Sequence, residues 1–287
     1  MEKERGKKKK QKGTMFKRSL FAASAVFVIG ATTVAAQNSD YFSMFFGHEG
    51  NAMDANQNSI KASKIVSGIE MEVEETIIGG KSALIIVSFE KQDGTAFSNN
   101  VKVPALELDW KQNASYMVDQ QMTEDHKKLI AMFDIDTTKK IDGKKLKIMA
   151  NKLVDESTDK VIADGPFHLS FEASESSSSK TIETNINLAL SDAELSLQTI
   201  NISANGIGVE GTRQDGKTGE LPQSTPLLKV TTLDNHTFEL KSGSTSTTET
   251  GFKWQFNLDE AGERLLLSNE NIKSVTIDGH TIEVTKE

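Results

Sequence analysis

The sequence predicts an all-β protein with two β-sandwich domains behind an N-terminal membrane-targeting segment. Apolar residues recur with a period of two along most of the chain after residue 60, which is the spacing of one face of a β-strand. Gly-containing turn signals separate these segments at short intervals, as in a sandwich. A basic head followed by an apolar run comes first, and this order is typical of export or anchoring.

Composition excludes several kinds of chemistry. The 287 residues contain no Cys, so disulfides, thiolate nucleophiles, thiolate zinc sites and CxxC redox motifs are all ruled out. The net charge of −8 hides an asymmetry: nine Lys and Arg against two Glu give residues 1–18 a charge of +7, which leaves −15 on the remainder. The molecule is therefore electrically bipolar.

The membrane-targeting segment consists of a basic cytoplasmic head, residues 1–18, and an apolar stretch, residues 19–36. The uncharged run Leu20 to Ala36 would span roughly 26 Å as a helix, against a hydrocarbon core of about 30 Å. The positive-inside rule places everything after residue 40 outside the cytoplasm. The predicted anchor residues are Leu20, Phe21, Val26, Phe27, Val28, Ile29 and Val34. The predicted topology signal is Lys7, Lys8, Lys9, Lys10, Lys12, Lys17 and Arg18.

Two interpretations of this segment remain open. Val34-Ala35-Ala36 offers small residues for a signal peptidase, so cleavage after Ala36 would release a secreted protein. The long basic head and the aromatic stretch Tyr41 to Phe46 favour a retained single-pass anchor in the cell membrane. In the second interpretation these aromatics lie at the outer membrane interface. A plainer alternative is that Phe45 and Phe46 pack on the first domain.

The basic head also resembles a nucleic-acid patch at Lys7 to Lys10. Its place before the apolar run favours contact with anionic lipid instead, and the charge of −15 on the rest of the chain would repel phosphate. We therefore expect the lipid bilayer as a partner and no nucleic acid.

The first sandwich domain is predicted over residues 47–173. Ile69, Met71 and Val73 alternate with glutamates, and the continuous apolar run Ala83 to Phe89 predicts a central strand covered on both faces. Gln120 to Lys128 is the one polar stretch in this half with room for a helical turn. Turn signals occur at Gly79-Gly80, Asp93-Gly94, Asp142-Gly143 and Asp164-Gly165-Pro166.

Residues 174–184 are predicted to be a Ser-rich linker, since a stretch without large apolar side chains gains too little burial to offset its ordering. The alternative is a loop inside one large domain. The second sandwich domain follows over residues 185–287. Its signals include the alternating segment Phe252 to Leu258, a short helix at Glu260 to Leu267, and a hairpin at Asp278-Gly279. The glycine-containing span Gly206 to Ser224 is predicted to be a surface loop or flexible excursion.

No catalytic, cofactor-binding or metal site is predicted. The five histidines, His48, His126, His168, His236 and His280, form no close pair, and we expect each at the surface or in a turn. His168 should point to solvent. No phosphate loop, dinucleotide fingerprint or nucleophile elbow is present.

Two acidic groups have plainer explanations than catalysis or metal binding. Asp134, Asp136 and Asp142 resemble the start of a calcium loop, but Lys139 and Lys145 occupy the places where the loop needs Gly and Glu. A solvated acidic face, or a looser oxygen-rich cation site between domains, explains them instead. The alternating glutamates at positions 70, 72 and 74 are expected on one open face, where water screens their repulsion.

The order of these segments resembles a known family. Lys64 to Thr95 (KIVSGIEMEVEETIIGGKSALIIVSFEKQDGT), Leu197 to Gly211 (LQTINISANGIGVEG) and Ile272 to Val284 (IKSVTIDGHTIEV) resemble the bacterial domain-of-unknown-function ectodomains of anti-sigma-factor-like single-pass membrane proteins in Gram-positive species. The resemblance implies Ig-like β architecture and a role in sensing or envelope regulation. Sigma-binding members carry a folded cytoplasmic domain, whereas 18 residues precede the apolar run here, too few for a core.

The leading hypothesis is a non-enzymatic, membrane-anchored protein that binds an unidentified envelope ligand or protein partner outside the cytoplasm. A second hypothesis is a secreted structural or adhesive surface protein. A third is a secreted wall-polymer hydrolase, which would require acidic residues and a histidine to converge in one cleft.

Overall fold

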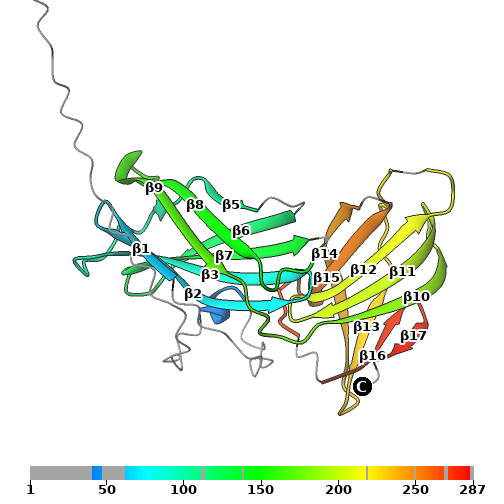
Figure 1. Cartoon of the computed structure of the whole chain (residues 1–287). Helices are drawn as coiled ribbons and strands as arrows, with labels where there is room; N and C mark the ends of the chain where they lie inside the picture. Colours follow the sequence, from blue (N-terminus) through cyan, green and yellow to red (C-terminus); the bar gives the residue numbers. More distant parts are fainter. Residues whose placement is uncertain are drawn as a thin grey trace, which may run out of the picture.

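The chain folds into two β units that lie side by side (Figure 1). The structure is a computed structural model that describes residues 41–46, 62–110, 114–137, 139–217, 219–248, 250–267 and 271–284. Within these ranges it is all-β, with one 3₁₀ turn, η1 (Phe42–Met44). The predicted fold class is confirmed at this level.

The first unit packs two antiparallel sheets face to face. The five-stranded sheet, in spatial order, contains β1 (Ala62–Val66), β2 (Ile69–Gly79), β3 (Ser82–Lys91), β7 (Lys128–Thr137) and β6 (Ala114–Met122). The other sheet contains β4 (Val101–Lys102), β8 (Lys145–Asp155), β5 (Leu106–Asp109) and β9 (Lys160–Glu172), which pairs with β8. Alternate apolar residues of both sheets, such as Val87 and Phe167, form the core between them.

β3 lies in the middle of the five-stranded sheet and is covered on both faces, as its uninterrupted apolar run predicts. Ile85 and Val87 point into the sandwich core. Leu84 and Ile86 point the other way, into a separate apolar cluster. Because residues alternate across a strand, a run without polar interruptions needs a second cover.

The second unit is one continuous antiparallel sheet that curves round a single core. Its strands, in spatial order, are β10 (Lys180–Ala189), β11 (Glu194–Ser203), β12 (Gly206–Arg213), β15 (Phe252–Leu258), β14 (Thr237–Thr247), β13 (Leu228–Thr232), β16 (Ile272–Ile277) and β17 (His280–Glu283). Trp254 from β15 and Val275 from β16 share this core, so the sheet folds back on itself and approaches a barrel (Figure 1).

A third apolar cluster joins the two units. Ile77, Leu84, Ile86, Ile130 and Met132 supply the outer face of the five-stranded sheet, and Ala204 and Leu266 supply the second unit. Phe42 and Phe46, on the segment 41–46, are also buried in it, with exposures of 0% and 5%. The interpretation that the aromatic stretch packs on the first domain is therefore confirmed for Phe46, and Phe42 is not available to lipid.

Four short-range predictions of turns are confirmed and two of helices are wrong. Asp93-Gly94 and Asp142-Gly143 form turns, with positive φ at each glycine. Asp278 and Gly279 both have positive φ and connect β16 to β17, and Gly79-Gly80 connects β2 to β3. Residues 120–128 contain the end of β6, a turn and the first residue of β7. The Gln120 side chain forms hydrogen bonds with the backbone of Val103. Residues 260–267 pair back on β15 through a bridge between Leu258 and Arg264.

The prediction of a loop from Gly206 to Ser224 is wrong for its first eight residues, which form β12. The glycines there allow close packing of backbones. A Cβ on Gly211 would lie 2.7 Å from the Ser196 carbonyl oxygen, and one on Gly206 would lie 2.3 Å from that of Phe256. Glycine in a strand often marks such an approach and not a loop.

Two further segments also differ from the sequence prediction. Asp164-Gly165-Pro166 lies inside β9, beside a register shift, and does not form a turn. In the Ser-rich segment, Ser176 is buried, and its hydroxyl accepts from the Ile78 amide at 2.9 Å. Residues 180–184 begin β10. Backbone hydrogen bonding to β2 thus replaces the apolar burial that the segment lacks.

Candidate functional site

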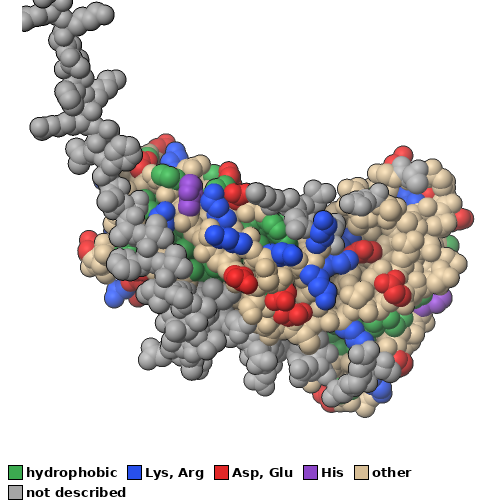
Figure 2. All heavy atoms as spheres, viewed as in Figure 1, with side chains coloured by type: hydrophobic (Ala, Val, Ile, Leu, Met, Phe, Trp, Pro, Cys, Tyr) green, Lys and Arg blue, Asp and Glu red, His purple; other side chains and the backbone are tan. Residues whose placement is uncertain are grey.

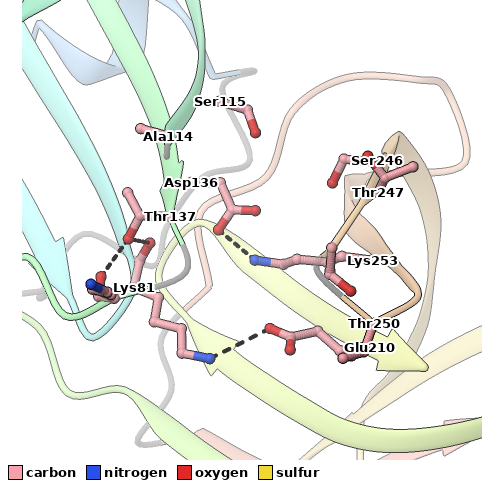
Figure 3. Close-up of a pocket in the computed structure, with 12 residues that line it drawn as sticks. Lys81, Ala114, Ser115, Asp136, Thr137, Glu210, Ser246, Thr247, Thr250 and Lys253 are labelled. Carbon is pink, nitrogen blue, oxygen red and sulfur yellow. Dashed lines mark hydrogen bonds and ion pairs between the residues drawn. The ribbon is translucent and has the colours of Figure 1, made fainter. Parts of the chain in front are cut away.

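A polar cleft lies where the two β units meet, and it is the candidate site. Its volume is about 700 Å³, within the usual range of ligand pockets. Figure 3 shows residues of both units facing it across the gap. The lining residues are Lys81, Ala114, Ser115, Asp136, Thr137, Lys139, Glu210, Ser246, Thr247, Thr248, Thr250 and Lys253.

Two ion pairs cross the cleft and connect the units (Figure 3). The Lys253 ammonium on β15 binds the Asp136 carboxylate at the end of β7, and the Lys253 side chain is only 8% exposed. The Lys81 ammonium lies 3.6 Å from the Glu210 carboxylate on β12. Because each lysine and its partner come from different units, both pairs bridge the junction.

A second, smaller cavity borders the same ion pairs. Its volume is about 340 Å³, and it shares Lys81, Asp136 and Lys253 with the first. Lys140, Lys180, Asn201 and Gln255 are among its other lining residues. The two cavities therefore adjoin one continuous strip of polar surface along the junction.

This strip carries an excess of positive charge. Five lysines line the two cavities, against the acidic residues Asp136 and Glu210. Lys139 and Lys140 are exposed, and within the described part of the chain no carboxylate forms an ion pair with either. Figure 2 shows basic side chains, Lys and Arg, gathered at the junction of the two lobes. This excess of positive charge is confined to the junction, since residues 19–287 as a whole carry a charge of −15.

Hydroxyl groups from both units also line the cleft. Ser246 and Thr247 end β14, where they pair with Lys253 and Phe252. Together with Ser115 and Thr250 they line the cleft, and their side chains make no hydrogen bond to another described residue. Free hydroxyls both donate and accept hydrogen bonds, so this wall suits a ligand rich in oxygen.

Among the cleft residues, Asp136 belongs to the acidic group recognised in the sequence, whereas the lysines and hydroxyls that line the cleft were not predicted. One signal was available: seven of the nine residues from Ser242 to Thr250 (SGSTSTTET) are Ser or Thr. Such a run lacks the alternation of apolar residues that a two-faced strand shows. The contribution of Lys81 and Lys253 has no local signal, because they lie 172 positions apart and meet only through the packing of the two units.

The acidic residues at 134 and 136 do not form a solvated face, which corrects the expectation for this group. The Asp134 carboxylate is 9% exposed and accepts a hydrogen bond from the Asn205 amide nitrogen at 2.6 Å. Asp136 is paired with Lys253, whereas Asp142 is exposed and binds the Glu175 amide elsewhere. Burial holds the pKa of Asp134 above its ordinary value, although the Asn205 hydrogen bond and Arg264 oppose the shift.

Glu74 also departs from the open face expected for the alternating glutamates. Its carboxylate accepts hydrogen bonds from Ser88 and Lys128, both at 2.6 Å. Burial disfavours the charge on Lys128, but the Glu74 carboxylate outweighs it and raises the pKa of Lys128. Tyr41, whose pKa is raised by burial and by Glu74, lies beside the pair. Glu74 therefore takes part in docking the segment 41–46.

The histidines that the structure describes are dispersed, and none lines either cavity. His168 is exposed, as expected from its place between two core residues of β9. In the described ranges no three His, Asp or Glu residues are close enough to hold a metal ion.

The predicted anchor residues, Leu20 to Val34, and the topology signal, Lys7 to Arg18, lie outside the described residues, as does His48. In the part of the chain that is described, no helix has the length and apolar character needed to cross a bilayer.

Comparison with known proteins supports the fold alone. No family model and no curated protein matches the chain. A solved structure described as a conserved domain protein from Bacillus anthracis is similar over 83% of both chains, with a TM-score of 0.59 and 13% sequence identity. At this identity the likeness shows a shared arrangement of strands across both β units.

Proposed function

We propose that the chain is a non-enzymatic, membrane-anchored binding or sensing protein of the bacterial envelope, and that the interdomain cleft is its binding site. The part after residue 36 lies outside the cytoplasm in this proposal, and residues 19–36 form the transmembrane helix. The proposal includes the finer kinship with Ig-like, anti-sigma-factor-like ectodomains.

The cleft is the observation that carries the proposal. Lysines and hydroxyls from both units face one space of about 700 Å³, and ion pairs within it bridge the units. Preorganised polar groups reduce the cost of ordering a site when a ligand binds. The order of basic head, apolar run and β units supports the location.

The absence of Cys allows a direct test of topology. Asn99 is exposed in a loop of the first unit, so Asn99→Cys in the full chain should react with a membrane-impermeant maleimide on intact cells. The matched variant Lys9→Cys should react only after the cells are permeabilised. Protection of the Asn99→Cys thiol on intact cells would place the β units in the cytoplasm and reject the proposal. Labelled protein in the medium would show a released chain instead.

The binding role has its own test. A photoreactive benzoylphenylalanine in place of Thr247, which is exposed and lines the cleft, should cross-link the full chain to an envelope component in intact cells. The same group in place of Lys160, on β9 and outside both cavities, should give no such product. Equal products from both positions, or none from Thr247, would contradict binding at the cleft.

A further inference from the structure

We infer that the cleft binds a polyhydroxylated polyanion, that is, a chain of phosphate or carboxylate groups that also carries hydroxyls. The inference rests on the proposed function and adds the chemical class of the ligand. Two observations point to this class: the local excess of lysines along the two adjoining cavities, and the wall of free hydroxyls at the end of β14.

The types of residue in the lining disfavour an apolar ligand. Among the twelve described residues of the larger cavity, Ala114 has the only purely hydrocarbon side chain. Sites for drug-like or lipid ligands are lined mainly by apolar and aromatic side chains. A ligand that enters this cleft must therefore gain its affinity from charge and hydrogen bonds.

The type of basic residue indicates which anions fit. None of the described residues lining the two cavities is an arginine, whose planar fork selects paired oxygens in fixed geometry. Lysine acts as a point charge on a flexible stem, and its ammonium binds phosphate and carboxylate alike. The ligand group that these lysines recognise is thus a negatively charged oxygen group, which either a phosphate or a carboxylate supplies.

The size and shape of the strip favour an extended chain over a single ion. The two cavities, of about 700 and 340 Å³, lie against the same three side chains, Lys81, Asp136 and Lys253. Lys139 and Lys140 add two exposed ammonium groups at the end of β7. Charges spaced along a strip match repeated anions, while the Ser246 and Thr247 hydroxyls face the groups between them.

Nucleic acid shares the negative charge but fits the lining poorly. Single strands are held by aromatic side chains on which the bases stack. No aromatic residue is among the described lining of either cavity. The net charge of −15 on residues 19–287 opposes every polyanion at low salt, so recognition of any of them depends on contacts inside the strip.

The test compares probes of known composition on the full chain in neutral-lipid nanodiscs. The probes are a glycerol phosphate oligomer, an oligogalacturonate, a neutral dextran oligomer and a single-stranded DNA of equal length. At 50 mM salt we expect at least one of the first two to bind at least tenfold more tightly than the dextran and the DNA. The one that binds identifies phosphate or carboxylate as the source of charge.

Variants separate the cleft from the basic head, whose charge of +7 attracts any polyanion. Lys139→Gln with Lys140→Gln should weaken binding of the preferred oligomer about tenfold at 50 mM salt, and less than threefold at 0.5 M, because salt screens the lost charges. The control, Lys152→Gln with Lys160→Gln, removes the same charge from exposed positions on β8 and β9. This control should leave the affinity for the oligomer within twofold of wild type, because both lysines lie outside the cavities. The basic head is unchanged in both double variants.

Hydrogen exchange locates the bound oligomer. Protection should appear from Ser246 to Lys253 and at Lys81, and it should be lost in the Lys139/Lys140 variant. The inference is overturned if neither anionic oligomer binds more tightly than dextran, if the DNA binds equally well, or if protection lies outside the strip. Cross-linking from position 247 without binding of either anionic oligomer would reject this ligand class and leave the proposed function standing.

Discussion

At the residue scale, Asp134 shows how the contact between the units changes a carboxyl group. The side chain lies on β7 and is covered by the second unit through Asn205. Arg264 lies 4.0 Å away, and Asp119 and Asp136 add negative charge nearby. Burial is the largest influence and raises the pKa of Asp134, so the folded state favours the neutral form.

Asp134→Asn should therefore change how stability depends on pH. Between the unfolded pKa, about 4, and the raised folded pKa, the native wild-type chain binds more protons than the unfolded chain. Its free energy of unfolding falls as pH rises through this window, and the loss is complete above the folded pKa. Asn keeps the acceptor for Asn205 but does not titrate. The variant should gain stability relative to wild type from pH 4 to 7 in urea unfolding. A constant difference over this range would show that Asp134 is not perturbed.

At the element scale, the segment 41–46 is part of the folded core. η1 places Phe42 and Phe46 between the five-stranded sheet and the second unit. The Lys128 ammonium lies 5.6 Å from the centre of the Tyr41 ring and is itself bound to Glu74. The segment begins only five positions after Ala36. An anchored chain would therefore hold the start of the segment 41–46 within about 20 Å of the end of the apolar run.

Phe42→Ala in a chain that begins at Gln37 should lower the free energy of unfolding by about 3 kcal/mol, because a fully buried ring leaves a cavity. Guanidinium unfolding measures the loss. The control Leu227→Ala removes an apolar side chain that is 44% exposed, and it should cost no more than about 0.5 kcal/mol. Equal effects of the two substitutions would show that the segment 41–46 does not contribute to the core.

At the scale of the whole molecule, the junction combines an apolar centre with a polar border. Leu266 and Ala204 of the second unit meet Ile86 and Met132 of the first in the shared cluster. Around them lie the pair of Lys253 with Asp136 and that of Arg264 with Asp119 at 2.9 Å. Such an interface couples the stability of the two units, since separating them exposes apolar surface.

We expect the wild-type chain from Gln37 to unfold in a single calorimetric transition. Leu266→Asp puts a charge into the apolar centre, where Leu266 is 5% exposed, and should weaken the junction by about 3 kcal/mol. The units should then melt in two separate transitions. Leu233→Asp, at a position that is 47% exposed, should retain one transition. A single transition in the Leu266 variant would mean that other contacts couple the units.

Much of the fold could be predicted from the sequence because strand formation is a local property. The apolar run at β3, the alternation in β15 and the Asp278-Gly279 hairpin each depend on neighbouring residues. The mistaken predictions arose where contacts with a distant segment of the chain determine the local structure. Gly211 belongs to a strand because β11 and β15 approach it closely. The residues next to it in the sequence do not indicate that approach.

The candidate site could not be predicted, for the same reason. Asp136 pairs with Lys253 across 117 positions, and the cleft exists only where the edges of two separately formed cores come together. The sequence by itself determined the all-β class, the placement of most strands and the bipolar distribution of charge, because these depend on composition and short-range periodicity. The tertiary structure alone decided which acids are buried, which lysines share a cleft and where the segment 41–46 docks, because contacts between distant residues depend on how whole sheets pack.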